Sequence, residues 1–394
     1  MRQVISKLTS RLSLLLLTLL LLPAGRVAAD VYVKLPYEMV NGKMIINANV
    51  DGLQGRFVFD TGAPFYITQA WADSLKHGSN GSQGIIDAAG NEFSVSKTTV
   101  NALVLGDSST VAFRNIKANV IPKGNIVESL GVNGIVGSDI FTDYILRIDS
   151  RQHCIIITDD LSRLHVNLRA KMAMETNGQN IPFVTVNLGG GIIETAMFDS
   201  GDDSLVSPGI DVASEMGQGN PAVSILSYGR GSNGVGMGGA SSVTERVRLL
   251  LKDFRMGTAK FRNLATVSIG GSGTRLGTRL LDYGIVTIDF QHPAFYYEAY
   301  SPQPVDLYKP AWNLDITYGD GYPVVAGVWA DTKAGFDAMP AIGDRITAVN
   351  GFALKPVSLA EALKGNLLHI KEEQATLTLT NAAGKTYSFL IKRK

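Results

Sequence analysis

The stretch MIINANVDGLQGRFVFDTGAPFYIT, residues 44–68, decides the fold. Its apolar run at residues 57–59 is typical of a buried strand, and Asp60, Thr61 and Gly62 follow directly. An unpaired carboxylate inside a protein is costly, so it usually shifts its pKa or finds a partner. Asp60 is therefore either an incidental turn residue or one half of a pair whose second carboxylate comes from elsewhere in the chain.

A second stretch, PFVTVNLGGGIIETAMFDSGDDSLVS at residues 182–207, repeats the order of strand, Gly turn, apolar strand and Asp-Thr/Ser-Gly. Two further echoes follow in the same order: FRNIKANVI from Phe113 with FRNLATVSI from Phe261, and IVGSDIFTDYILRIDSRQHCIII from Ile135 with RLGTRLLDYGIVTIDFQHPAFYY from Arg275. Ordered self-similarity indicates a duplicated unit. We predict two related, mainly β lobes, residues 31–160 and 175–300, joined by the polar stretch at residues 159–180.

The spacing within the two copies also agrees. Asp60 precedes Gly137 by 77 residues, and Asp199 precedes Gly277 by 78. A single Asp-Thr/Ser-Gly triplet is ordinary turn composition, but two at matching places in a repeat are not. A pseudo-twofold axis between the lobes would bring the two aspartates face to face and give each carboxylate its partner.

This duplicated pattern resembles the aspartic peptidases, and more closely their compact retropepsin-like lobes. The elements that carry the resemblance are FVFDTGA with GIVGSDIF, and AMFDSGDD with TRLGTRLL. The resemblance covers about 270 residues and implies two pseudo-symmetric acid-protease-like β lobes. Carried over by position, Asp60 and Asp199 would form the catalytic dyad of an endopeptidase.

The resemblance also implies roles for the residues that follow each aspartate. Thr61 and Ser200 would send their hydroxyl groups across the interface to lock the two loops together. Gly62 and Gly201 would allow the backbones to approach closely.

The chemistry needs two carboxylates within hydrogen-bond reach. Such a pair shares one proton, aspartic proteases being the standard illustration. The ionised member can take a proton from water while the other hydrogen-bonds the peptide carbonyl. No cofactor or metal is expected, because the five histidines are scattered and form no His-Glu-x-x-His motif.

Each lobe also contains a candidate hairpin over the cleft, as the resemblance implies for a flap. In the first lobe the turn around Gly90 lies about 30 residues after the first aspartate. In the second lobe Tyr228 and Gly229 follow the second aspartate at a similar distance. The family's Tyr-Gly pair belongs to the first lobe, so Tyr228 is either a substrate-contacting flap residue or an ordinary loop aromatic.

The last part of the chain, residues 305–394, differs in character. It follows the Pro-containing linker at residues 301–310, and Ser358-x-x-Glu361 predicts a capped short helix. The sequence from Gly343 to Gly351 matches the Gly-Asp-x-Ile-x-x-Val-Asn-Gly stretch of PDZ domains, so the segment resembles a small α+β PDZ-like domain. We expect it to be separable from the lobes.

PDZ domains bind a peptide as an added strand and hold its carboxylate with backbone amides. The loop of this chain that we equate with their carboxylate-binding loop is YGDGYPVV, residues 318–325, in which Asp320 is anionic and Pro323 has no amide donor. The tail is therefore either a peptide-binding domain or a docking and substrate-orienting module.

Residues 1–29 have the composition of a secretory signal peptide. A basic start precedes the apolar run at residues 12–22, which is too short to span a bilayer, and small residues at 27–29 offer a cleavage site. We expect export to the periplasm or the extracellular space, with no integral membrane segment in the mature chain. Cys154 is the single cysteine and is expected in the core.

The charge balance of 36 Lys and Arg against 35 Asp and Glu favours neither a nucleic acid nor an anionic membrane as partner. A peptide or protein substrate is the expected partner. Asp202 stands where the family has a small residue, and near the dyad its charge would raise both carboxyl pKa values. Two alternatives remain: a catalytically silent peptide-binding or adaptor protein, and a glycosidase with paired carboxylates.

Overall fold

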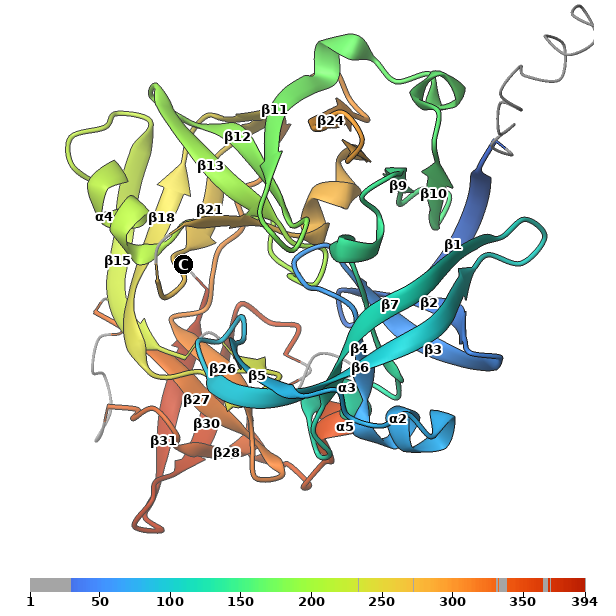
Figure 1. Ribbon diagram of the computed structural model, residues 1–394. Coiled ribbons are helices and arrows are strands. Elements are labelled where there is room, and N and C mark those ends of the chain that lie inside the picture. Colours follow the sequence, from blue (N-terminus) through green and yellow to red (C-terminus); the bar gives the residue numbers. More distant parts are fainter. Residues whose placement is uncertain are drawn as a thin grey trace, which may run out of the picture. The chain divides into compact units, whose positions relative to one another are not determined.

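The computed structural model describes residues 30–232, 234–271, 273–330, 332, 339–363, 368 and 370–393 (Figure 1). Residues 32–394 form one compact unit in which strands dominate, which confirms the predicted mainly β fold. The predicted signal peptide at residues 1–29 lies outside the described residues. In the described ranges, no helix has the length and apolar character needed to cross a membrane.

The first lobe contains β1 (Tyr32–Val40), β2 (Lys43–Val50), β3 (Leu53–Asp60), β4 (Tyr66–Thr68), α2 (Gln69–Leu75), β5 (Ser82–Ile86), β6 (Glu92–Leu105), β7 (Val111–Ile121), α3 (Ile126–Ser129), β8 (Gly134–Gly137), β9 (Ile145–Asp149) and β10 (Cys154–Thr158). Strand β3 lies between β2, which is antiparallel to it, and β8, which is parallel. Phe57, Val58 and Phe59 are all buried because both faces of this central strand are covered.

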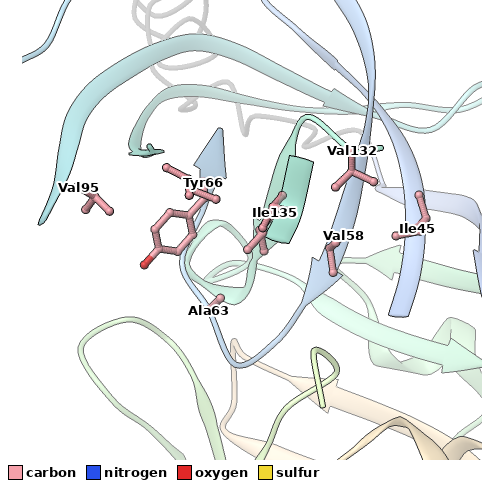
Figure 2. Packing of buried hydrophobic residues seen from close by; sticks show 9 residues of the cluster. Ile45, Val58, Ala63, Tyr66, Val95, Val132 and Ile135 are labelled. Carbon is pink, nitrogen blue, oxygen red and sulfur yellow. The ribbon is translucent and has the colours of Figure 1, made fainter. Parts of the chain in front are cut away.

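A core cluster lies behind the end of β3. Figure 2 shows Val58 of β3, Tyr66 of β4 and Ile135 of β8 in this cluster, beside Ala63 of the turn that follows the strand. Met237 of the second lobe packs against the same cluster. The turn after β3 is thus held by apolar contacts from several elements.

The second lobe contains β11 (Lys171–Thr176), β12 (Pro182–Gly189), β13 (Ile192–Phe198), β14 (Val206–Ser207), α4 (Ile210–Met216), β15 (Val223–Gly231), β16 (Val235–Gly236), β17 (Gly239–Ala240), β18 (Thr244–Leu251), β19 (Phe254–Met256), β20 (Ala259–Arg262), β21 (Leu264–Val267), β22 (Thr274–Leu276), β23 (Gly284–Asp289) and β24 (Ala294–Ala299). Its β12, β13 and β22 pair as β2, β3 and β8 do in the first lobe. The alternating sequence of β11 forms a strand within the stretch that we expected to be a polar connection.

One six-stranded antiparallel sheet joins the two lobes in the order β1, β10, β9, β23, β24, β11. Three strands come from each lobe, and the order of the first three mirrors that of the last three. Cys154 of β10 is buried in this sheet, as expected for a core cysteine. The central pair β9 and β23 runs antiparallel, with Ile148 opposite Val286.

The tail contains β25 (Val305–Asp306), β26 (Leu314–Gly319), β27 (Tyr322–Trp329), β28 (Arg345–Val349), β29 (Phe352–Ala353), α5 (Leu359–Ala362), β30 (Gln374–Thr380) and β31 (Thr386–Lys392). The predicted capping box of Ser358 and Glu361 is confirmed at the start of α5. The stretch that we equated with a carboxylate-binding loop forms the end of β26, the start of β27 and the turn between them.

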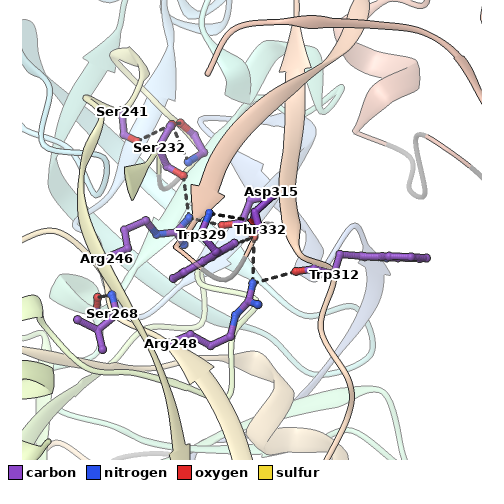
Figure 3. Close-up of polar contacts among 11 residues, drawn as sticks. Ser232, Ser241, Arg246, Arg248, Ser268, Trp312, Asp315, Trp329 and Thr332 are labelled. Atoms are coloured by element: carbon purple, nitrogen blue, oxygen red, sulfur yellow. Dashed lines mark hydrogen bonds and ion pairs between the residues drawn. The ribbon is translucent and has the colours of Figure 1, made fainter. Parts of the chain in front are cut away.

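The tail shares a sheet with the second lobe. Strand β15 pairs with β18 on one edge and with β27 of the tail on the other. Figure 3 shows the side chains at this joint: Arg246 forms an ion pair with Asp315 at 2.7 Å, and Arg248 donates to the Trp312 carbonyl at 3.0 Å. The Arg248 guanidinium lies 4.1 Å from the Trp329 ring centroid. Our expectation of a separable tail is therefore not supported.

Candidate active site

Asp60 and Asp199 lie at the ends of equivalent strands. Asp60 ends β3 and lies opposite Gly137 across the parallel pair of β3 and β8. Asp199 follows β13, and its backbone N–H donates to the Leu276 carbonyl of β22 at 2.9 Å. The structure thus brings together the two carboxylates that the repeat singled out.

Thr61 and Ser200 cross the interface between the two loops. The Thr61 hydroxyl donates to the Phe198 carbonyl at 2.8 Å, and the Ser200 hydroxyl donates to the Phe59 carbonyl at 3.0 Å. Each hydroxyl also accepts the other residue's backbone N–H, at 2.9 and 3.0 Å. Because Thr61 is 1% exposed and Ser200 0%, these four hydrogen bonds satisfy groups that water does not reach.

Gly62 and Gly201 let the two loops approach closely. The N–H of Gly62 donates to Asp60 Oδ1 and the N–H of Gly201 to Asp199 Oδ1, both at 2.8 Å. A Cβ at Gly62 would lie 2.5 Å from Asp199 Cγ, and one at Gly201 would collide with the Asp60 carboxyl group. Glycine is required at both positions because each backbone faces the carboxyl group of the other lobe.

The two carboxyl groups hydrogen-bond each other; Asp199 is buried and Asp60 is partly exposed. Burial raises the pKa of Asp199 well above its ordinary value, and the neighbouring charge of Asp60 raises it further. Burial also raises the pKa of Asp60, but the hydrogen bond from Asp199 and the Gly62 N–H oppose that increase. These directions favour Asp60 as the ionised member of the pair and Asp199 as the protonated one.

Three charged side chains act on this pair. Lys43 opposes the increase in the pKa of Asp60, and its Nζ donates a short hydrogen bond to the Gly201 carbonyl. Asp202 raises the pKa of Asp199, one of the two aspartates for which the sequence predicts this effect, whereas Arg275 lowers it. The Asp202 carboxylate accepts the N–H of Ser204 at 2.6 Å, so it also caps its own turn.

A cavity of about 480 Å³ contains both aspartates, and we call it the dyad cavity. One wall is the apolar cluster of the first lobe, including Tyr66, whose pKa burial raises to about 12. Polar groups from Lys43 and Gln179 lie on other parts of the lining. Leu363 at the end of α5 also contributes, so the tail reaches the site.

Two hairpins border the dyad cavity: the flap hairpin of β5 and β6, and the second-lobe hairpin of β16 and β17. Asp87, at the tip of the flap hairpin, accepts the N–H of Ala89 at 2.9 Å and that of Gly238 in the other hairpin at 2.7 Å. Asn91 Nδ2 donates to the Gly239 carbonyl at 3.0 Å. The tips of the two hairpins are therefore connected.

The predicted flap residues have different outcomes. Gly90 lies in the flap turn with φ at 83°, a left-handed conformation that favours glycine. Tyr228 and Gly229 lie within β15, where pairing on both edges keeps them in a sheet, and they line a different cavity with Trp329. The sequence placed the second-lobe flap too early, because residues 235–237 take that place.

Among the residues that line the dyad cavity, sequence reasoning missed Lys43, Tyr66, Met237 and Leu363. Tyr66 follows the Asp-Thr-Gly triplet closely enough to have been suspected. Met237 lies in the glycine-rich stretch that we considered for Tyr228. Lys43 and Leu363 carry no local signal, since only the fold brings them to the cavity.

A larger cavity, of about 930 Å³, lies between the second lobe and the tail and contains neither aspartate. The candidate active site is therefore the smaller dyad cavity. In the part of the chain that the structure describes, no group of three or more His, Cys, Asp or Glu side chains could hold a metal ion.

The model of the Aspartyl protease family matches residues 46–140, which is most of the first lobe. This match includes Asp60 and supports an aspartic protease. No curated protein matches the chain.

Three solved structures show weak similarity. A retropepsin-like aspartic protease from Rickettsia conorii is 21% identical, with coverage of 33% of this chain and 93% of that chain and a TM-score of 0.25. Basic 7S globulin from soybean is 11% identical, with coverage of 69% and 95% and a TM-score of 0.40. Conglutin gamma, a basic 7S globulin from lupine seeds, is 14% identical, with coverage of 69% and 96% and a TM-score of 0.43.

Proposed function

We propose that the protein is an aspartic endopeptidase that hydrolyses peptide bonds with a water activated between Asp60 and Asp199. The observation that carries this proposal is the hydrogen bond between two carboxyl groups in a cavity bordered by hairpins of both lobes. The family match in the first lobe supports the same function.

We assign the roles of the two aspartates from the directions in which their environments shift their pKa values. Asp60, as the ionised member, takes a proton from the water whose oxygen attacks the peptide carbonyl carbon. Asp199 donates its proton to the carbonyl oxygen as the tetrahedral intermediate forms. When that intermediate collapses, the protonated Asp60 gives its proton to the leaving amine, and Asp199 recovers its own from the hydroxyl. Each proton is accounted for without a metal ion.

The test uses purified chain without residues 1–29 and a library of unmodified peptides. We expect hydrolysis that a statine-type transition-state mimic inhibits. Asp60→Asn and Asp199→Asn should each abolish it, because each removes one half of the shared-proton pair but nearly keeps its shape. Asp203→Asn is the matched control, since this exposed carboxylate lies two residues after Gly201 and does not line the dyad cavity.

The same experiment separates the alternatives. Near wild-type turnover in either dyad variant would refute the two-carboxylate mechanism. Binding of peptides without hydrolysis by the wild-type protein would favour the catalytically silent adaptor. Hydrolysis of glycosides but not of peptides would favour a glycosidase.

We also propose that residues 1–29 direct export and are removed, which would place the mature protein in the periplasm or the extracellular space. N-terminal sequencing of the protein from the exported fraction should find a start near Asp30. An uncleaved chain retained in the cytoplasmic fraction would contradict this proposal.

For the tail we propose a peptide ligand that adds as a strand to β26. Among the described strands β26 pairs with β27 alone, and its Leu314 and Ile316 line the 930 Å³ cavity together with Lys309 and Arg393. The two cations would suit a peptide carboxylate. Fluorescence anisotropy with peptides that have free or amidated C-termini tests this, and equal binding of both would contradict carboxylate capture.

A further inference from the structure

Each lobe sends the turn between its first two strands toward the dyad. In the first lobe the Gly42 carbonyl accepts the Thr278 hydroxyl of the second lobe at 3.0 Å. In the second lobe the Gln179 carbonyl accepts the Ser138 hydroxyl of the first lobe at 3.5 Å. Thr278 and Ser138 directly follow the two repeated glycines, so the two turns occupy equivalent places.

The turns differ in the side chain that they bring to the dyad cavity. The first lobe brings Lys43 and the second brings Gln179. Among the described residues that line this cavity, Lys43 alone carries a positive charge. The pseudo-symmetry of the site is therefore broken by one ammonium group on the first-lobe side.

The backbone and the opposite loop fix the position of Lys43. Asn41 and Gly42 form its turn with φ of 51° and 75°, and a Cβ at Gly42 would lie 2.5 Å from Asp203 Cβ. The Lys43 ammonium donates to the Gly201 carbonyl, and the same glycine has its Cα against the Asp60 carboxyl group. The positive charge is thus held across the lobe interface, beside the two aspartates.

We propose that Lys43 is a positioning residue: its ammonium group, anchored on the Gly201 carbonyl, makes the carboxyl pair asymmetric, so that Asp60 is ionised and acts as the base. The inference rests on the proposed function of the same site. Lys43 acts through Asp60 and takes no proton in the reaction.

Two other charges near the pair act on Asp199 rather than on Asp60: Asp202 raises its pKa and Arg275 lowers it, and the effect of Asp202 is the larger. Asp202 therefore favours the same asymmetry from the other aspartate. Tyr66 faces Asp60 from β4, but burial raises its pKa to about 12, so it is neutral at working pH. Lys43 is the charge that acts on Asp60 without such an opposing neighbour.

The test compares pH profiles of kcat/KM for a peptide without charged side chains. Removal of the cation in Lys43→Met disfavours ionisation of the pair, so both limbs of the profile should move to higher pH. We expect a loss of roughly tenfold in kcat/KM at a fixed pH on the acid limb, with a smaller change at the optimum. Lys43→Arg should restore the wild-type limbs.

Lys117→Met is the control, because it removes an exposed lysine of β7 that does not line the dyad cavity. If Lys43→Met does not fold, Lys43→Gln replaces it, because glutamine is the counterpart residue of the second lobe. The same upward shift of both limbs of the pH profile is expected. Superimposable limbs in a folded variant would overturn the proposal, as would a loss that is equal at every pH.

A rise in KM confined to acidic peptides would also overturn it, because it would make Lys43 a substrate-binding residue. Failure of the proposed function is a separate result: wild-type protein would then show no statine-sensitive hydrolysis at any pH.

Discussion

Removal of the Ser200 hydroxyl should destabilise the fold much more than an ordinary Ser→Ala change. This hydroxyl donates to the Phe59 carbonyl at 3.0 Å and accepts the Thr61 N–H at 2.9 Å, with no exposed surface. Ser200→Ala loses two hydrogen bonds of about 1 kcal/mol each and leaves two buried polar groups without these partners. We expect a loss of about 3 kcal/mol in the free energy of unfolding.

Urea unfolding at neutral pH measures this loss, with the m-value as a check that the compactness of both states is unchanged. Ser214→Ala is the matched control, because that hydroxyl donates to the Ile210 carbonyl at 2.8 Å on the exposed side of α4. It should change stability by at most about 0.5 kcal/mol. Thr61→Val removes the opposite hydroxyl and should cost as much as Ser200→Ala.

The double variant Thr61→Val with Ser200→Ala should cost less than the sum of the single variants, because each single change already breaks part of one shared network. A Ser200→Ala loss below about 1 kcal/mol at an unchanged m-value would refute the argument. The two loops would then be held by packing rather than by the crossed hydroxyl groups.

Three further predictions concern residues other than the two aspartates. Burial raises the pKa of Asp139 to about 6, so the fold favours the protonated carboxyl group: the protein is most stable with respect to this group below about pH 4, and that stability is lost as the pH rises through 6. Asp139→Asn should therefore raise the free energy of unfolding at pH 8 by about 3 kcal/mol in thermal or urea unfolding, and an effect that does not change with pH would contradict this. Asp87→Ala removes the acceptor of the Gly238 N–H and should raise amide hydrogen exchange in residues 84–91 and 234–241 about tenfold, measured by mass spectrometry, whereas unchanged exchange would show that the hairpin tips do not depend on this contact. Deletion of residues 305–394 exposes the edge of β15 and leaves Arg246 without its carboxylate partner, so the truncated protein should aggregate in light scattering; a monomeric, folded truncation with full turnover of short peptides would show that the tail is separable after all.

The sequence was sufficient to predict the two aspartates and their supporting residues. Each lies at the end of an apolar run, and the second copy of the pattern removes the ambiguity that a single Asp-Thr-Gly would leave. The fold class follows from the same alternation of apolar residues. These features are local or repeated, so they can be recognised without knowledge of the packing.

Contacts between single residues in different lobes could not be predicted. Lys43 is an ordinary turn residue in the sequence, and Asp87 is an ordinary hairpin aspartate. The pairing of Gly229 with Trp329 joins strands about 100 residues apart, and the sequence of neither strand indicates which strand it pairs with. For the same reason Tyr228 resembled a flap residue, although its strand is covered on both edges.

The two copies of the pattern supply two equivalent carboxylates, but the proposed peptide hydrolysis needs one base and one acid. The repeated motifs cannot make this distinction, because Asp60 and Asp199 follow equivalent strands and receive equivalent hydrogen bonds from Gly62 and Gly201. We propose that residues in which the copies have diverged bias this choice, and Lys43 is such a residue. The strands and loops that position the two aspartates are thus related by pseudo-symmetry, whereas the charged side chains that would distinguish the base from the acid are not.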